Sequence, residues 1–196
     1  MKTGHGALVA ATLLVLSACS TSEPSASPEG SADPAGQRLD QIEAAVAAWA
    51  GAESLEAAHA AAEEARNLVV GPAGPFYGDA DGDGELAGDV AEGLLPGLDG
   101  ETGLAQSEPV SACVEADVLG GSWEDPGERW DVALAAYDAW TPSNNTMPTL
   151  PSHPQRVVGW ATFTLGTDDL DEAREYAGHA QIHVRVSRAA IEDCGS

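Results

Sequence analysis

Positive charge is scarce in this 196-residue chain, which has eight lysine and arginine residues against 32 aspartate and glutamate residues, for a formal net charge of −24. A polyanion of this charge density is repelled by phosphate backbones and by anionic lipid head groups. The composition therefore argues against nucleic acid as a partner. It suits a salty or calcium-rich medium, in which cations reduce the self-repulsion of the surface.

Local signatures of catalysis are also missing. The sequence contains no HExxH motif and no glycine-rich phosphate loop, and neither Ser122 nor Ser187 lies in a nucleophile motif. Carboxylates are so common in the chain that no pair of them stands out as an acid and its base. We therefore expect that the protein is not an enzyme.

Long apolar runs are limited to one, residues 7–16, which is too short to span a bilayer and has the length of a signal-peptide core. The run ends on Leu16-Ser17-Ala18-Cys19, a tetrapeptide that resembles the lipobox of bacterial lipoproteins. This resemblance implies that residues 1–18 are a signal peptide and that Cys19 is diacylated and becomes the first residue after cleavage. A secretory signal without lipidation is the alternative.

The lipobox sets the expected location and domain organisation. It implies a protein held in the cell membrane by its lipid anchor and facing outside the cytoplasm. Residues 19–36 comprise the lipidated cysteine and a stretch rich in Ser, Pro, Ala and Gly, which predicts a flexible linker. Residues 37–196 are then long enough for a single domain.

The clearest ligand pattern is Asp-Ala-Asp-Gly-Asp-Gly at residues 79–84. Its spacing resembles the first half of a calcium loop of the EF-hand or dockerin type, without the usual entering helix. The resemblance implies calcium as the cofactor. The final acidic ligand of such a loop would fall on Val90, so we expect its neighbour Asp89 to replace it, with Glu92 as the other choice. The expected ligands are Asp79, Asp81, Asp83, Glu85 (through its carbonyl) and Asp89. An acidic turn without an ion is the alternative reading.

Two cysteines remain if Cys19 is lipidated. Cys113 and Cys194 are the two cysteines left, and outside the cytoplasm the environment is oxidising. An even number of cysteines there predicts one disulfide between them. Two free thiols are the alternative, although neither cysteine has the sequence context of a nucleophile.

Apolar residues recur at helical spacing through most of the chain and predict an all-α fold. We expect helices at about 38–50 and 54–70, near 108–119, at 126–140 and from 168 or 169 to about 193, with a loop at 141–154. Residues 156–165 are ambiguous between helix and strand. The predicted architecture is a helical bundle built from helical hairpins, with a long calcium-binding loop insertion.

A faint repeat relates the two ends of this domain. At an offset of 115 residues, Gly51 matches Gly166 and Leu55 matches Leu170, and two alanines of each following helix also match. The repeat suggests two related helical hairpins. Chance similarity between alanine-rich helices explains the match equally well.

Histidines provide a second metal hypothesis. His179 and His183 follow Glu175 at four-residue steps, and His59 is followed by Glu63 at the same spacing. Such stripes, if they face each other inside a bundle, are able to bind zinc or iron. Amphipathic residues at the edge of the core are the simpler interpretation.

The sequence therefore predicts a lipid-anchored, calcium-binding helical protein that serves as a non-catalytic binding or scaffolding module of the cell envelope, with an envelope protein or ligand of unknown identity as its partner. The alternative is a transition-metal binding protein that uses His59, Glu63, His179 and His183.

Overall fold

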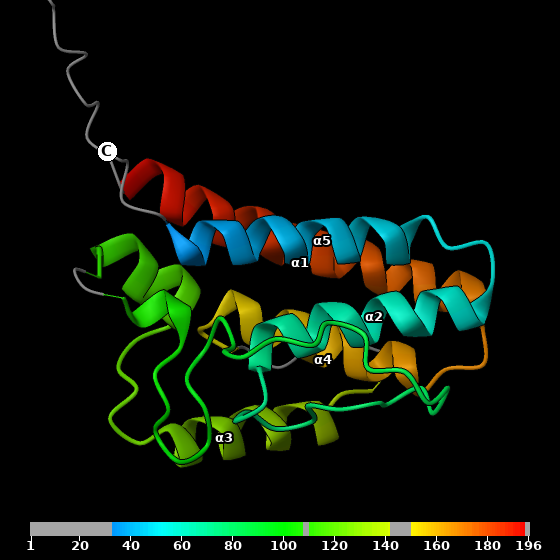
Figure 1. Ribbon diagram of the computed structural model, residues 1–196, viewed down its shortest axis with the longest axis horizontal. Helices are drawn as coiled ribbons and strands as arrows, with labels where there is room; N and C mark the ends of the chain where they lie inside the picture. The colour runs from blue at the N-terminus through cyan, green and yellow to red at the C-terminus, as the bar shows by residue number, and fades with distance from the viewer. Residues whose placement is uncertain (1–32, 108–109, 142–149, 195–196) are drawn as a thin grey trace, which may run out of the picture. The chain divides into compact units, whose positions relative to one another are not determined.

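The computed structural model describes residues 33–107, 110–141 and 150–194, except for the side chain of Cys194. Within these ranges all regular structure is helical, which confirms the predicted all-α fold (Figure 1). The described part contains no helix that is long and apolar enough to cross a membrane. The elements are α1 (Pro34–Ala50), α2 (Leu55–Val70), the 3-10 helix η1 (Leu104–Gln106), the π-helix η2 (Val114–Leu119), α3 (Pro126–Asp138), α4 (His153–Leu165) and α5 (Leu170–Cys194).

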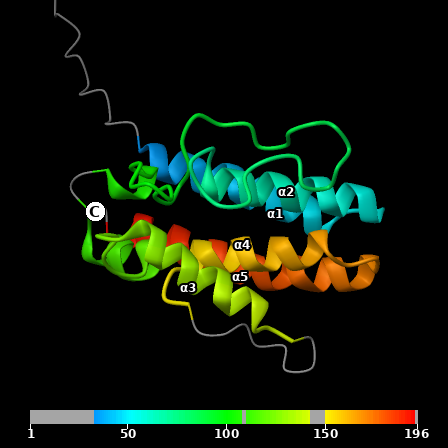
Figure 2. The same cartoon turned by 90° about the horizontal axis from the view of Figure 1, so that it is seen from below.

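Four of these helices form a bundle. Helix α1 packs against α2 and α5, and α4 packs against the same two helices, so that the hairpins α1–α2 and α4–α5 lie side by side. Helix α3 lies outside the bundle against α4 (Figure 2). The predicted bundle of helical hairpins is therefore confirmed.

Two helices begin earlier than the sequence predicts. Helix α1 starts at Pro34, because the Asp33 carboxylate accepts a hydrogen bond from the Gly36 N–H at 2.9 Å and a proline at the first position needs no donor. Residues 34–36 are thus the first turn of the domain and not part of a linker. Helix α4 starts at His153, inside the predicted loop, because the Ser152 hydroxyl accepts from the N–H of Gln155.

Residues 156–165 are helical throughout and lie within α4. The predicted helix near 108–119 is shorter, because regular structure begins after residue 111 and η2 stops at Gly120, whose φ is +70°. Helix α3 ends at Asp138, two residues before the predicted end.

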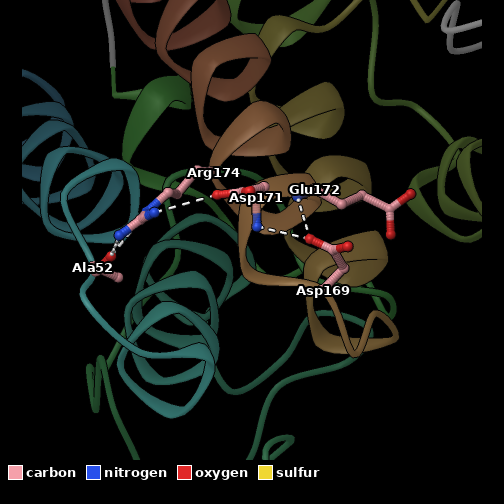
Figure 3. A network of polar contacts seen from close by, with 5 residues as sticks. All are labelled: Ala52, Asp169, Asp171, Glu172 and Arg174. Atoms are coloured by element: carbon pink, nitrogen blue, oxygen red, sulfur yellow. Dashed lines mark hydrogen bonds and ion pairs between the residues drawn. The ribbon is translucent and has the colours of Figure 1, made fainter.

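The two hairpins turn in the same way. Gly51 ends α1 with φ −92° and ψ 2°, and Gly166 ends α4 with φ −102° and ψ −4°. Three residues later, Ser54 caps α2 and the Asp169 carboxylate accepts from the backbone of the first turn of α5 (Figure 3). The positions that the faint repeat pairs therefore have equivalent roles in the structure.

Reciprocal contacts join these two turns. The Arg174 guanidinium donates from Nε to the carbonyl of Ala52 at 2.9 Å (Figure 3). His59 Nε2 lies 3.1 Å from the carbonyl of Thr167. The repeat offset pairs His59 with Arg174 and Ala52 with Thr167, so each hairpin contacts the turn of the other through equivalent positions. This reciprocity is the signature of an approximate two-fold axis between the hairpins.

Small side chains occupy equivalent buried positions in the two hairpins. The four alanines that the repeat pairs are fully buried; they are Ala58, Ala62, Ala173 and Ala177. Larger apolar side chains, among them Trp49 and Ile42, fill the remaining core. The bundle is therefore sensitive to added volume at the alanine positions.

Cys113 is disulfide-bonded. The other predicted partner is Cys194, whose side chain lies outside the described part of the chain. The bridge between these two cysteines therefore stays a prediction.

Larger side chains at equivalent buried alanines of the two hairpins should destabilise the protein to a similar extent. We expect Ala62→Leu and Ala177→Leu each to lower the free energy of unfolding by about 1–3 kcal/mol, because a leucine has no room at a fully buried alanine. Ala57→Leu, on the exposed face of α2, should change it by no more than about 0.5 kcal/mol. Urea unfolding measures all three, and similar values for the buried and exposed positions would contradict the packing described here.

Candidate metal centre

A long loop, residues 71–103, packs along the outside of α2. Every residue from Ala61 to Val70 except Glu64 is buried, because the bundle covers one face of this helix and the loop covers the other (Figures 1 and 2). The loop backbone also bonds to the end of the helix, with the N–H of Leu95 donating to the carbonyl of Val69 at 3.1 Å. A Cβ at Gly88 would lie 2.7 Å from the Glu64 carbonyl oxygen, so only glycine allows this close approach.

Glu63 of α2 binds the loop with both carboxylate oxygens. Its side chain is 1% exposed. Oε2 accepts hydrogen bonds from the N–H groups of Ala80 at 2.5 Å and Asp81 at 3.2 Å, and Oε1 accepts from the N–H of Ala87 at 2.9 Å. A single buried carboxylate thus holds two separate parts of the acidic loop, which comprises residues 79–89 of the long loop.

Asn67 lies one turn further along the same face of α2 and completes the attachment. It is fully buried, and its Nδ2 donates to the carbonyls of Gly78 at 3.1 Å and Ala87 at 2.8 Å. Its Oδ1 accepts from the Gly78 N–H at 3.2 Å. Glu63 and Asn67 are spaced four residues apart, which places both side chains on one stripe of the helix.

Backbone N–H groups of the loop donate hydrogen bonds to the carboxylates of Asp79 and Asp81. The two oxygens of Asp79 accept from the N–H groups of Gly82 at 2.8 Å and Gly84 at 3.0 Å. Asp81 accepts from the Asp83 N–H at 3.1 Å. Gly82 and Gly84 have φ angles of +77° and +89°, which glycine adopts without strain. The loop is therefore wound tightly, with its carboxylates held by backbone donors.

Three carboxylates converge at this place. Glu63, Asp79 and Asp81 each offer an oxygen, and the three oxygens lie within 4.8 Å of one another, an arrangement that no other His, Cys, Asp or Glu residues of the described part share. Burial raises the pKa of Asp81, the hydrogen bond from the Asp83 N–H opposes this shift, and the negative charges of Asp83, Glu63 and Asp79 add to it. The cluster is able to hold a metal ion, and a cation would relieve this repulsion.

A buried positive charge lies close to the cluster. Arg66 of α2 is 4% exposed, and burial lowers its pKa to about 10 while the charge of Glu63 opposes that shift. Its guanidinium lies 5.5 Å from the centre of the Phe76 ring. Arg66 therefore offsets part of the negative charge that Glu63 brings into the interior.

The predicted loop ligands divide into two sets. Asp79 and Asp81 belong to the cluster, whereas the carboxylate of Asp83 does not. The cluster consists of side-chain oxygens alone, so the expected carbonyl ligand of Glu85 stays a prediction. Asp89 also lies outside the cluster, and its Oδ1 accepts a hydrogen bond from the Tyr77 hydroxyl at 2.9 Å, so its role as a ligand stays a prediction. The additional carboxylate comes from Glu63, which the sequence assigned only to a histidine site.

The alternative histidine site does not assemble. His59 contacts the turn before α5, and Glu63 contacts the acidic loop. His179 stacks on the Trp160 ring with the ring centres 4.5 Å apart, and His183 contacts another histidine, His153. The stripes of α2 and α5 thus meet different neighbours, so these four residues do not share one site.

Glu63→Gln should uncouple the loop from α2. An amide offers one acceptor oxygen where the carboxylate offers two, so at least one buried N–H loses its partner, at a cost of about 1–3 kcal/mol in the free energy of unfolding. Urea unfolding in EGTA measures this cost without a contribution from metal. Glu64→Gln removes the same charge from the neighbouring, less buried position and should change stability by no more than about 0.5 kcal/mol. Equal effects of the two substitutions would show that Glu63 does not hold the loop.

Comparison with known proteins gives no relative for this chain. No protein family, no curated protein and no solved structure matches it. The interpretation of the site therefore depends on its own residues and geometry.

Proposed function

We propose that this protein is a lipid-anchored, calcium-binding helical module of the cell envelope that faces outside the cytoplasm and acts by binding or scaffolding rather than by catalysis. The observation that carries the calcium proposal is the convergence of buried Glu63 on the carboxylates of Asp79 and Asp81. The proposed partner is an envelope protein or ligand.

The chemistry of the cluster favours calcium over other metals. All three side chains offer oxygen, which hard cations prefer, and none offers nitrogen or sulfur. Calcium accepts six to eight oxygens in a flexible geometry, so water and nearby loop oxygens are able to complete its shell. Magnesium requires a stricter octahedral arrangement and binds fewer protein ligands. Asp79 is exposed and Asp81 half-buried, so the ion has a path from solvent.

Calcium at this cluster would stabilise the whole domain. Glu63 belongs to α2, which packs in the bundle against α1 and α4, so an ion bound by Glu63 and the loop links the insertion to the core. A ligand that binds only the folded state adds about 2.7 kcal/mol to stability at a concentration 100 times its dissociation constant. Calcium sites of extracellular modules have dissociation constants of about 0.1–1 mM. Calcium at about 1–10 mM, ten times such a constant, would therefore add about 1.4 kcal/mol to the stability of the domain.

The membrane anchor is a separate element of the proposal. Cys19 and the predicted signal peptide lie outside the described residues. The support is the lipobox-like sequence at residues 16–19, followed by a Ser- and Pro-rich tether before α1. The transition-metal alternative has less support, because its four residues lie in different surroundings.

Calcium should raise the thermal midpoint of the full chain by several degrees relative to EGTA, since the ion binds only the folded state. Asp81→Asn should abolish this shift. Asp99→Asn removes one negative charge from an exposed position in the same insertion and should retain it. A calcium shift that survives Asp81→Asn would contradict the proposed site.

The pH dependence in EGTA provides a further control on this variant. The raised pKa of Asp81 means that the folded state binds its proton more tightly than the unfolded state does, so wild-type stability falls as pH rises from the unfolded-state pKa through the folded one. Asp81→Asn should lack this component and be at least as stable as wild type at neutral pH without calcium. A destabilised variant under these conditions would contradict the repulsion inferred at Asp81.

If Cys19 is lipidated, the protein expressed in a bacterial host should partition into detergent rather than into water. Wild type should enter the detergent phase of a Triton X-114 separation, whereas Cys19→Ser should remain in the aqueous phase, because acyl chains bind membranes by apolar burial. Cys113→Ser removes a cysteine at another position and should partition as wild type does. Detergent partition of the Cys19→Ser protein would show that Cys19 is not the anchor.

A further inference from the structure

Two histidines face each other where the start of α4 meets the middle of α5. His153 Nδ1 lies 3.0 Å from His183 Nδ1, and the ring centres are 5.2 Å apart. Both side chains are half-buried, and 30 residues separate them in the sequence. The packing of the two helices therefore brings the pair together, which the sequence pattern did not reveal.

The surroundings keep both imidazoles neutral at neutral pH. Burial lowers the pKa of His183 to about 3, and positive charge on His153, Arg156 or His179 lowers it too. Burial and Arg156 also lower the pKa of His153, against the charge of Asp117. In the neutral pair, one Nδ1–H donates to the lone pair of the other Nδ1. Neutral imidazole is the form that binds metal ions, so no proton has to be displaced from the protein.

The separation of the nitrogens suits one metal ion. If the donor imidazole moves its proton from Nδ1 to Nε2 through solvent, both Nδ1 lone pairs become free. The two rings then have to turn so that the lone pairs, which face each other in the hydrogen-bonded pair, meet at a metal ion beside the N–N line. With metal–nitrogen bonds of about 2.0–2.1 Å, nitrogens 3.0 Å apart subtend an angle of roughly 90–100° at the metal. This angle matches neighbouring positions of a square-planar or tetragonal ion better than those of a tetrahedral one.

We propose that His153 and His183 together bind one divalent transition-metal ion, with preference for Cu(II). Imidazole nitrogen suits copper, which also binds most tightly among the divalent first-row metals. Water occupies the remaining positions, and Asp117 of η2 supplies nearby negative charge from a third element. Arg156 is fixed by a hydrogen bond from Nε to the Leu150 carbonyl at 2.8 Å, and its charge limits the affinity.

This site is independent of the proposed calcium centre. The calcium cluster contains only carboxylates, whereas the histidine pair contains only nitrogen ligands, so the two sites select different classes of metal. Asp81→Asn should therefore leave copper binding unchanged. The calcium proposal and the copper proposal can therefore fail separately, and each failure is recognised by its own metal titration.

The test is a titration of Cu(II) into the full chain, without a polyhistidine tag and with calcium in excess, followed by electron paramagnetic resonance. We expect one equivalent to bind with an axial spectrum and hyperfine coupling to two nitrogens. His153→Asn and His183→Asn should each weaken binding at least tenfold. His59→Asn, which removes a histidine at another place in the bundle, should bind as wild type does. Copper affinity that survives His183→Asn would overturn the proposal.

A second measurement on wild type decides the question if the variants do not fold. Cu(II) is paramagnetic and broadens the resonances of the side chains that bind it. At substoichiometric Cu(II), the ring-proton signals of His153 and His183 should disappear before those of His59 and His179. Selective loss of the other histidine signals would overturn the proposal.

Discussion

The carboxylate of Glu63 connects the two parts of the described domain. It lies on the face of α2 that the loop covers and accepts hydrogen bonds from the backbone N–H groups of Ala80, Asp81 and Ala87. A charge with 1% exposure is costly to bury, and it is stable here because three donors and the nearby Arg66 surround it. The same position allows Glu63 to join the loop aspartates, so the attachment of the loop and the proposed calcium site depend on one side chain.

The few positive charges of the chain have mainly structural contacts. Arginine side chains donate to backbone carbonyls where the chain leaves a helix or passes through a loop. These arginines are Arg38 on the carbonyls of Leu68 and Glu92, Arg129 on Leu119 and Gly120, Arg156 on Leu150, and Arg174 on Ala52. Arg188 of α5 instead pairs with Asp40 and Glu43 of α1. Scarce cations thus hold helices and turns together in an otherwise acidic protein.

Much of the fold could be predicted from the sequence, because its signals are local. The positions of the two hairpins follow from helical periodicity, from the capping residue Ser54 and from the breaks at Gly51 and Gly166. The start of α4 was missed because a proline at the beginning of a helix resembles a loop residue until its cap, Ser152, is recognised.

The site could be predicted only in part. The aspartate spacing identifies the loop, but the contact between Glu63 and this loop depends on how the insertion folds back on α2. Glu63 and Asn67, two polar residues four apart in the helix that precedes the loop, were the available signal. The contact of His153 with His183 likewise depends on the packing of α4 on α5, which no local pattern encodes.

The most direct test of the central claim is a crystal structure of the protein grown with calcium. We expect one calcium peak bonded to carboxylate oxygens of Glu63, Asp79 and Asp81 at about 2.3–2.6 Å. A loop without a calcium peak at saturating calcium, or an ion bound by Asp83 and Asp89 without Glu63, would contradict it.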